Sequence, residues 1–291
     1  MAGALAHCGS DVPQAIRANA TNPAGFYEPR WVVDFHKEQL ERAGVRTLDT
    51  DPDALARMEA VTGDAQVRDT LRSWLAARLE EHDRLVLKDP RMVWFRDLWV
   101  AVAHDLGLDP AFVVMLRHPS EVSSSRSEFY NVEEVTGVAG WIDVALMTER
   151  LTRESPRALV LYPRLTADWR GELVRLRGLL DLHLDPAPEQ TPHPADDFID
   201  PALRRREPGW DDARVPSYLT GLADEVFAAL DELTTGAGET GPDLAARLDG
   251  LGERYATLHA EALALTSHHL KRVKEQTRRR TARRLRQGSG S

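Results

Sequence analysis

The chain of 291 residues has only one cysteine, Cys8, which excludes an intrachain disulfide framework and any metal site built from several cysteines. The ten histidines show no metal-ligand spacing, and no G-x-S-x-G motif of a serine hydrolase is present. No uninterrupted apolar run approaches the roughly 18–20 residues that span a bilayer. The N-terminus also lacks the basic and apolar segments of a signal peptide. We therefore expect a cytoplasmic protein without a membrane span and without a metal cofactor.

Charge is unevenly distributed along the chain. Residues 271–291 hold nine basic residues and one acidic residue, a net charge of +8. Because the net charge of the whole chain is −9, the remaining 270 residues carry a net charge of −17. A basic terminus can attract nucleic acid, anionic lipid or an acidic partner. It can equally be a solvated helix end whose cations complement the helix dipole, which is the interpretation we favour. Nucleic acid is therefore an unlikely partner despite the basic tail.

Three short runs rich in Val and Leu, at 84–88, 111–117 and 157–162, are typical of strands that are buried on both faces. The segments around them have apolar residues at helical spacing. Helices are expected at 53–81, 94–106, 119–130, 139–153, 168–182, 217–234 and 243–275. Alternating strands and helices indicate an α/β fold with a parallel sheet, in which ligands bind beyond the carboxyl ends of the strands.

Composition also divides the chain. Seven of the 17 prolines fall within 186–216, so this segment is expected to be an irregular lid or linker. We expect one α/β domain over 1–234, followed by a C-terminal helix with a basic tail over 235–291.

The first candidate site follows the strand at 111–117. Arg117 ends this strand, and Pro119 stands where it can open the next helix. A guanidinium beside a helix N-terminus can bind an anion, because the unpaired N–H groups and the helix dipole add to its charge. Ser125 can supply a hydroxyl from the same helix. Alternatively, Arg117 pairs with one of the many acidic residues.

The second candidate site is the segment Lys88-Asp89-Pro90-Arg91 at the end of the run at 84–88. Pro90 keeps Asp89 out of the helical conformation, so that a polar cluster turns outward. Two cations around one carboxylate can bind an anionic substrate or can form a structural salt bridge. The residues alone do not favour either reading.

The motifs LKDPRMVWFRDLW and FVVMLRHPSEVSSSR together resemble the bacterial branch of the sulfotransferase family. TNPAGFYEPRWV, LVLYPRLTADW and FIDPALRRREPGW are similar to further elements of that family, and the likeness covers about residues 1–210. The resemblance implies a three-layer P-loop-type parallel sheet flanked by helices. It also implies the donor 3′-phosphoadenylyl sulfate as co-substrate and a small-molecule, glycan or lipid acceptor.

The resemblance assigns roles to individual positions. Arg117 and Ser125 would bind the 3′-phosphate of the donor, Tyr162 would lie near the adenine, and Arg204 and Arg205 would close on the same phosphate. Glu28 matches the family's catalytic base, although a carboxylate before a helix start is also a common dipole partner. Asp89 is the alternative base, and Lys88 or Arg91 would hold the sulfonate or the acceptor.

Two family features have no counterpart in the sequence. The family's first strand and its phosphate loop, Arg-Ser-Gly-Thr-Ser or Lys-x-Gly-Thr-Thr, are missing, and MAGALAHCGSDV resembles the helix that follows this loop. In members that use a histidine base, the base stands two residues after the lysine, where this chain has Pro90. The chain is therefore expected to be a sulfotransferase-like protein that begins after its phosphate loop. The alternatives are a non-catalytic remnant that binds an adenosine bisphosphate or a protein, and an interaction protein that acts through the basic tail.

Overall fold

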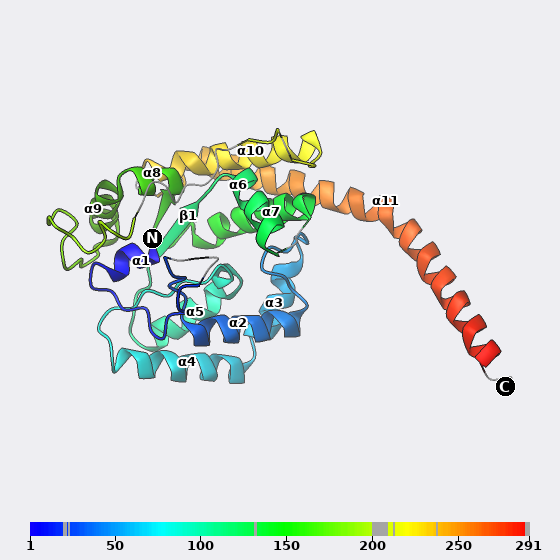
Figure 1. The fold of residues 1–291 in the computed structure, drawn as a ribbon, viewed down its shortest axis with the longest axis horizontal. Helices are drawn as coiled ribbons and strands as arrows, with labels where there is room; N and C mark the ends of the chain where they lie inside the picture. The colour runs from blue at the N-terminus through cyan, green and yellow to red at the C-terminus, as the bar shows by residue number, and fades with distance from the viewer. Residues whose placement is uncertain are drawn as a thin grey trace.

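The structure is a computed structural model that describes residues 1–19, 22, 24–130, 133–199, 209–211, 213–236 and 238–288. For 126–130, 268–271 and 273–288 it describes the helical backbone and not the side chains. The described residues are mostly helical (Figure 1). Two strands, β1 (Phe112–Leu116) and β2 (Arg157–Leu161), pair in parallel as a small sheet, with Phe112 opposite Arg157 and Leu116 opposite Leu161.

Two of the three expected strands are thus confirmed, and the third is wrong. Segment 84–88 makes one isolated parallel bridge, between Leu85 and Asp11. The Asp11 N–H donates to the Arg84 carbonyl at 2.9 Å, and the Val86 N–H donates to the Asp11 carbonyl at 2.8 Å. The ladder stops there because the chain after Asp11 enters a turn that includes Gln14, at φ 52°. Apolar character alone does not make a strand where a neighbouring strand of matching length is missing.

Helices cover both faces of the two-stranded sheet. The chain returns from β1 to β2 through α6 (Pro119–Tyr130) and α7 (Glu134–Thr152). On one face, Leu159 of β2 joins an apolar cluster with α7, α10 (Ser217–Asp231) and α11 (Pro242–Gly288). On the other face, Ala158 and Val160 pack against α9 (Trp169–Leu180) and the short N-terminal α1 (Ala2–Ala6). Strand β2 is therefore buried on both sides, as its apolar sequence predicted.

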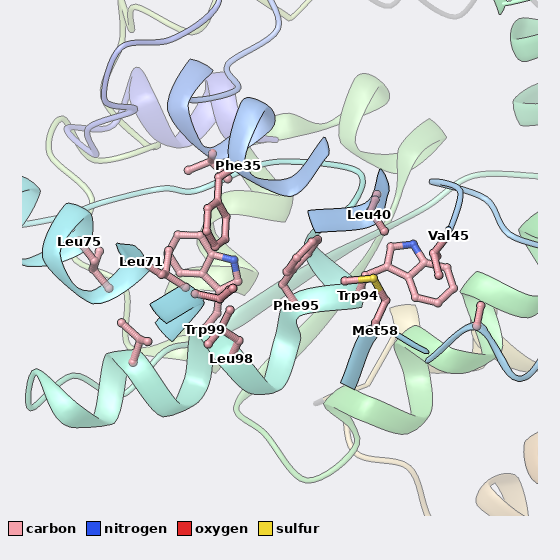
Figure 2. Packing of buried hydrophobic residues seen from close by; sticks show 14 of the residues in the cluster. Phe35, Leu40, Val45, Met58, Leu71, Leu75, Trp94, Phe95, Leu98 and Trp99 are labelled. Atoms are coloured by element: carbon pink, nitrogen blue, oxygen red, sulfur yellow. The ribbon is translucent and has the colours of Figure 1, made fainter. Parts of the chain in front are cut away.

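A second group of helices has its own apolar core. Helices α2 (Arg30–Ala43), α3 (Ala54–Thr62), α4 (Ala65–Leu79) and α5 (Arg96–Asp105) surround Trp94 and Phe95 of the 3₁₀ turn η1 (Met92–Phe95) (Figure 2). The expected helix at 53–81 is two helices, because Asp64 caps α4 by accepting the Gln66 N–H at 2.9 Å.

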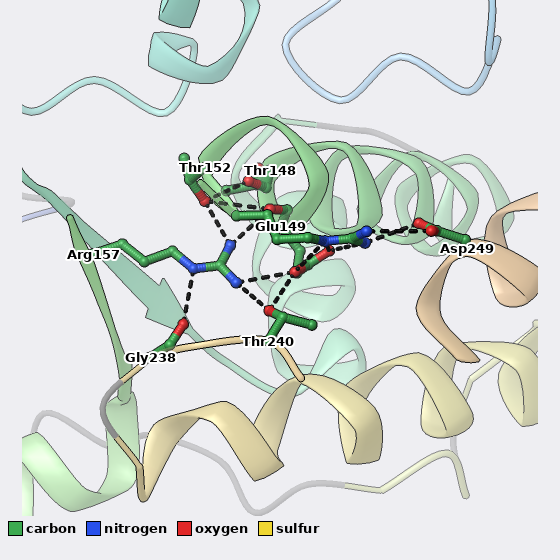
Figure 3. A network of polar contacts seen from close by, with 8 residues as sticks. Thr148, Glu149, Thr152, Arg157, Gly238, Thr240 and Asp249 are labelled. Carbon is green, nitrogen blue, oxygen red and sulfur yellow. Dashed lines mark hydrogen bonds and ion pairs between the residues drawn. The ribbon is translucent and has the colours of Figure 1, made fainter. Parts of the chain in front are cut away.

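A buried polar network ties β2 to the helices on one face of the sheet (Figure 3). Glu149 of α7 accepts hydrogen bonds from Arg157 at 2.9 Å, from Arg153 at 2.7 Å and from Thr240 at 2.7 Å. Arg153 also pairs with Asp249 of α11 at 2.8 Å. Burial alone would raise the pKa of Glu149, but these hydrogen bonds outweigh it and lower the pKa. The charges are paired and satisfied, so the network holds α7, α11 and β2 in one arrangement.

The remaining expected elements are found with shifted ends. Helix α8 (Tyr162–Ala167) follows β2 directly, α10 is followed by the 3₁₀ turn η3 (Glu232–Thr234), and α11 begins at Pro242. Within the described part of 186–216, no helix or strand occurs before Pro216. Helix α11 leaves the rest of the molecule along its second half (Figure 1). None of the described helices is long and apolar enough to cross a membrane.

Candidate functional site

The carboxyl ends of β1 and β2 bring two of the expected site residues into contact. Leu116 and Leu161 are paired in register, so the residues that follow them, Arg117 and Tyr162, leave the sheet side by side. The Arg117 guanidinium lies over the Tyr162 ring at 4.7 Å from its centre. Its Nε donates to Glu121 Oε2 at 2.9 Å, and the Arg117 side chain remains 31% exposed. A cation held over an aromatic ring at a partly open strand end can still receive an anion.

The first turn of α6 is capped by His118. The Ser120 N–H points at His118 Nδ1 at 3.3 Å, and the Ser120 hydroxyl lies 2.8 Å from the same nitrogen. Because Nδ1 accepts these groups, the ring proton belongs on Nε2, which faces Asp224 of α10 at 3.5 Å. Burial lowers the pKa of His118, although Asp224 and Glu121 act to raise it. The Gly209 N–H donates to the Ser120 hydroxyl at 3.1 Å, so the backbone at 209 lies against the start of this helix.

Ser125 lies within α6, eight residues after Arg117, and is half-buried. Among the described residues its hydroxyl has no hydrogen-bond partner. At 1.5 Å of rise per residue, Ser125 stands about 9 Å along the helix axis from Pro119. Among the described residues, no hydrogen bond or ion pair joins Ser125 to Arg117.

Glu28 and Lys88 form an ion pair between two segments that are distant in sequence. The Glu28 side chain is 12% exposed and the Lys88 side chain is 42% exposed, so the pair lies at the surface on the lysine side. Glu28 directly precedes Pro29, the N-cap of α2, and follows Tyr27, whose φ of 50° is uncommon for a residue with a side chain. Backbone strain of this kind is often found at functional sites, because it fixes one side chain in place.

Asp89 is the centre of a buried hydrogen-bond cluster. It accepts the N–H of Arg91 at 2.8 Å and the Arg91 guanidinium at 2.8 Å, and it lies 3.3 Å from His36 Nδ1. The Trp99 N–H donates to His36 Nε2 at 2.9 Å, which places the imidazole proton on Nδ1, toward Asp89. Burial lowers the pKa of His36 against the opposing effect of Asp89, in keeping with a ring whose Nε2 accepts a hydrogen bond.

The two carboxylates proposed as the base therefore differ in their surroundings. Burial by itself raises the pKa of Asp89, but the hydrogen bond from His36, the hydrogen bond from the Arg91 backbone and the charge of Arg91 outweigh it, and the pKa is lowered. A carboxylate with a lowered pKa is a weaker proton acceptor. The contacts of Asp89 hold segment 88–91 against His36 of α2, whereas the Glu28 side chain is paired with a partly exposed lysine.

Sequence reasoning missed the partners that hold these side chains. Glu121 stands four residues after Arg117, and this spacing is a signal for an ion pair at a helix start. His36 gave no local signal, because its partner Asp89 is 53 residues away. Arg204 and Arg205 lie outside the described residues. Among the described residues, no group of three or more His, Cys, Asp and Glu side chains could hold a metal ion.

Comparisons of the chain with protein-family models, with curated proteins and with solved structures find no match.

Proposed function

We propose that the protein is sulfotransferase-like and transfers a sulfuryl group from 3′-phosphoadenylyl sulfate to an acceptor hydroxyl or amine. The observation that carries the proposal is the contact between Arg117 and Tyr162 at the joint carboxyl ends of β1 and β2. Parallel sheets bind ligands at this edge, and the two residues are those to which the sequence resemblance assigns the donor nucleotide. The burial of β2 on both faces supports a three-layer arrangement of the P-loop type.

In this proposal, the nucleotide end of the donor is held where β1 gives way to α6. Arg117 and the helix N-terminus supply positive charge for the 3′-phosphate, and Ser125 supplies a hydroxyl donor. The Tyr162 ring offers an apolar surface for the adenine. Arg204 and Arg205 would contribute further positive charge to the same phosphate.

The transfer step is an in-line displacement at sulfur. The bond between sulfur and the 5′-phosphate oxygen breaks as the acceptor oxygen or nitrogen bonds to sulfur, and the electron pair leaves with the adenosine bisphosphate. Glu28 takes the acceptor's proton, for which it must exchange its contact with Lys88 for one with the acceptor. Lys88, being partly exposed, then stands free to hold an oxygen of the sulfonate.

A second candidate function is nucleotide binding without transfer. The sequence contains no Gly-Thr-Ser phosphate loop, and backbone amides of such a loop are what would neutralise the 5′-phosphosulfate. A protein with the Arg117 site alone would bind an adenosine bisphosphate and would not stabilise the transition state.

Calorimetry with adenosine 3′,5′-bisphosphate and adenosine 5′-monophosphate tests the site. We expect the wild-type chain to prefer the bisphosphate, and Arg117→Ala to remove this preference by losing about 1–3 kcal/mol of binding free energy, as for a hydrogen bond to a charged group. Arg68→Ala is the matched control, since Arg68 is an exposed arginine paired with Asp105 on α4 and α5. Unchanged discrimination in Arg117→Ala, or no binding by the wild type, would overturn the proposal.

A transfer assay separates the two functions. The probes are the sulfuryl donor with a phenol or an aryl amine as acceptor. If the protein transfers the sulfuryl group, we expect release of adenosine bisphosphate. We expect this release to fall in Glu28→Gln while the affinity for the nucleotide is unchanged. Nucleotide binding without any transfer to either probe would favour the second function.

A further inference from the structure

Helix α11 is much longer than the surface on which it rests. Its 47 residues span about 70 Å at 1.5 Å per residue. The first half is anchored, since Leu248, Leu251 and Tyr255 are buried and the Tyr255 hydroxyl donates to the Thr50 carbonyl at 2.7 Å. The second half extends away from the rest of the described chain (Figure 1). Most helical stability in proteins comes from packing of an apolar face, so a partner along this half would stabilise it.

The apolar side of α11 continues past its anchored half. Leu251, Leu258 and Leu265 are seven residues apart and share one side of the helix. Leu251 is buried and Leu258 is partly buried, but Leu265 is 82% exposed. The same apolar stripe that packs against α10 is therefore open to solvent one heptad later.

A groove lies beside this open stripe. It has a volume of about 490 Å³ and lies between the start of α10 and the middle of α11. Tyr218, Leu222 and Leu258 supply its apolar lining, and Tyr218 is 62% exposed. Gly250 forms part of the lining, and no atom stands within 4 Å of where its side chain would begin. The polar part of the lining is formed by Glu253, Arg254, Thr257 and Glu261. Within the described part of the chain, the apolar part of the groove and the exposed Leu265 together form a surface that no other element covers.

The charges on either side of this surface are complementary. Residues 271–291 carry +8. Residues 217–254, which include α10 and the anchored half of α11, hold eight acidic and two basic residues, a net charge of −6. Helix α10 itself contains three acidic residues and no Lys or Arg. Two basic helices side by side would repel each other, whereas a basic helix along this acidic surface is attracted.

We propose that the free half of α11 docks on the α10–α11 surface of a second copy of this chain. An antiparallel pairing centred near Ala262 places each Leu265 beside the partner's groove. It also runs each basic tail along the acidic residues 217–254 of the other copy. The arrangement is reciprocal, as a two-fold interface requires, because each copy supplies both a tail and a groove. This interface is independent of the nucleotide site and of the function proposed for it.

Sedimentation velocity on the full chain tests the proposal, at salt concentrations of about 0.05 M and about 0.5 M that bracket strong and weak screening. We expect a dimer at low salt that dissociates at high salt, and a monomer at both when the chain ends at residue 267. Leu265→Asp should weaken dimerisation by about tenfold or more, which corresponds to about 1.4 kcal/mol. Leu263→Asp is the matched control, because Leu263 is 51% exposed and lies on the opposite side of the same helix turn.

A full-length chain that stays monomeric at low salt would overturn the proposal. So would a dimer that survives truncation at residue 267, or one that Leu263→Asp weakens as much as Leu265→Asp does. Both substitutions are at exposed positions, and circular dichroism of each variant should match that of the wild type.

Discussion

Asp143 of α7 is a half-buried carboxyl group that faces two other carboxylates. It makes no hydrogen bond or ion pair with another described residue, and burial together with the charges of Asp49 and Asp51 raises its pKa to about 7, although Arg150 acts to lower it. Its burial follows from the close approach of α7 to the turn before α3. A side chain at Gly140, one helical turn away, would begin 2.5 Å from the Leu48 carbonyl.

The raised pKa makes stability depend on pH in a defined direction. At low pH the Asp143 carboxyl is protonated in both the folded and the unfolded chain, so it does not affect the free energy of unfolding. Between about pH 4 and 7 the unfolded chain ionises Asp143 while the folded chain does not, so stability is lost as pH rises through this range. The rise of the Asp143 pKa from its ordinary value of 3.8 to about 7 corresponds to about 4 kcal/mol as an upper limit. Solvent screening at a half-buried position reduces the expected loss to about 1–3 kcal/mol.

Asp143→Asn removes this titration while it keeps the shape of the side chain. We expect the variant to be about as stable as the wild type near pH 4, and more stable by about 1–3 kcal/mol near pH 8. Urea unfolding at a series of pH values measures the difference directly. Asp69→Asn on the exposed face of α4 is the control and should change neither value. Parallel stability profiles for the wild type and Asp143→Asn would refute the reasoning.

Two further predictions concern packing. Glu149→Gln leaves the buried Arg157 without a counter-charge and leaves Arg153 with Asp249 alone. We expect a loss of about 3–5 kcal/mol in unfolding free energy, and a loss below about 1 kcal/mol would contradict the role of the network. Gly140→Ala should destabilise the fold by about 1–3 kcal/mol, because the added Cβ would meet the backbone of Leu48. Gly221→Ala on α10 is the control and should stabilise the fold by up to about 1 kcal/mol, because no atom lies within 4 Å of the added Cβ. Equal effects of the two substitutions in thermal unfolding would show that α7 does not pack closely against the 45–53 turn.

Elements that depend on local pattern could be predicted from the sequence. The runs at 111–117 and 157–162 became β1 and β2, and Pro119 opens α6 as its fixed φ favours. Segment 84–88 is similarly rich in Val and Leu but forms one bridge. A strand needs a neighbouring segment to pair with, and the segment that pairs with Leu85 turns away after Asp11. The apolar pattern is shared by strands and by extended segments without a ladder, so it does not separate the two.

The candidate site shows the same division between local and distant causes. The pairing of Arg117 with Glu121 follows from a spacing of four residues that can be read in the sequence. The ion pair of Glu28 with Lys88 and the cluster of Asp89 with His36 join segments 60 and 53 residues apart. Nothing local encodes such contacts, so the partners of Glu28 and Asp89 could not be predicted from the sequence.

The contact between Arg117 and Tyr162 shows how the fold turns two separate motifs into one surface. Each residue follows its strand directly, and the parallel register of Leu116 with Leu161 makes both leave the sheet at the same level. A slip of one residue would send one of the two side chains to the other face of the sheet. The buried network around Arg157 works against that slip, because Arg157 begins β2 and is bound to α7 and to the segment before α11. The candidate binding surface at the carboxyl end of the sheet is therefore set by a charge cluster at its amino end, one strand length away.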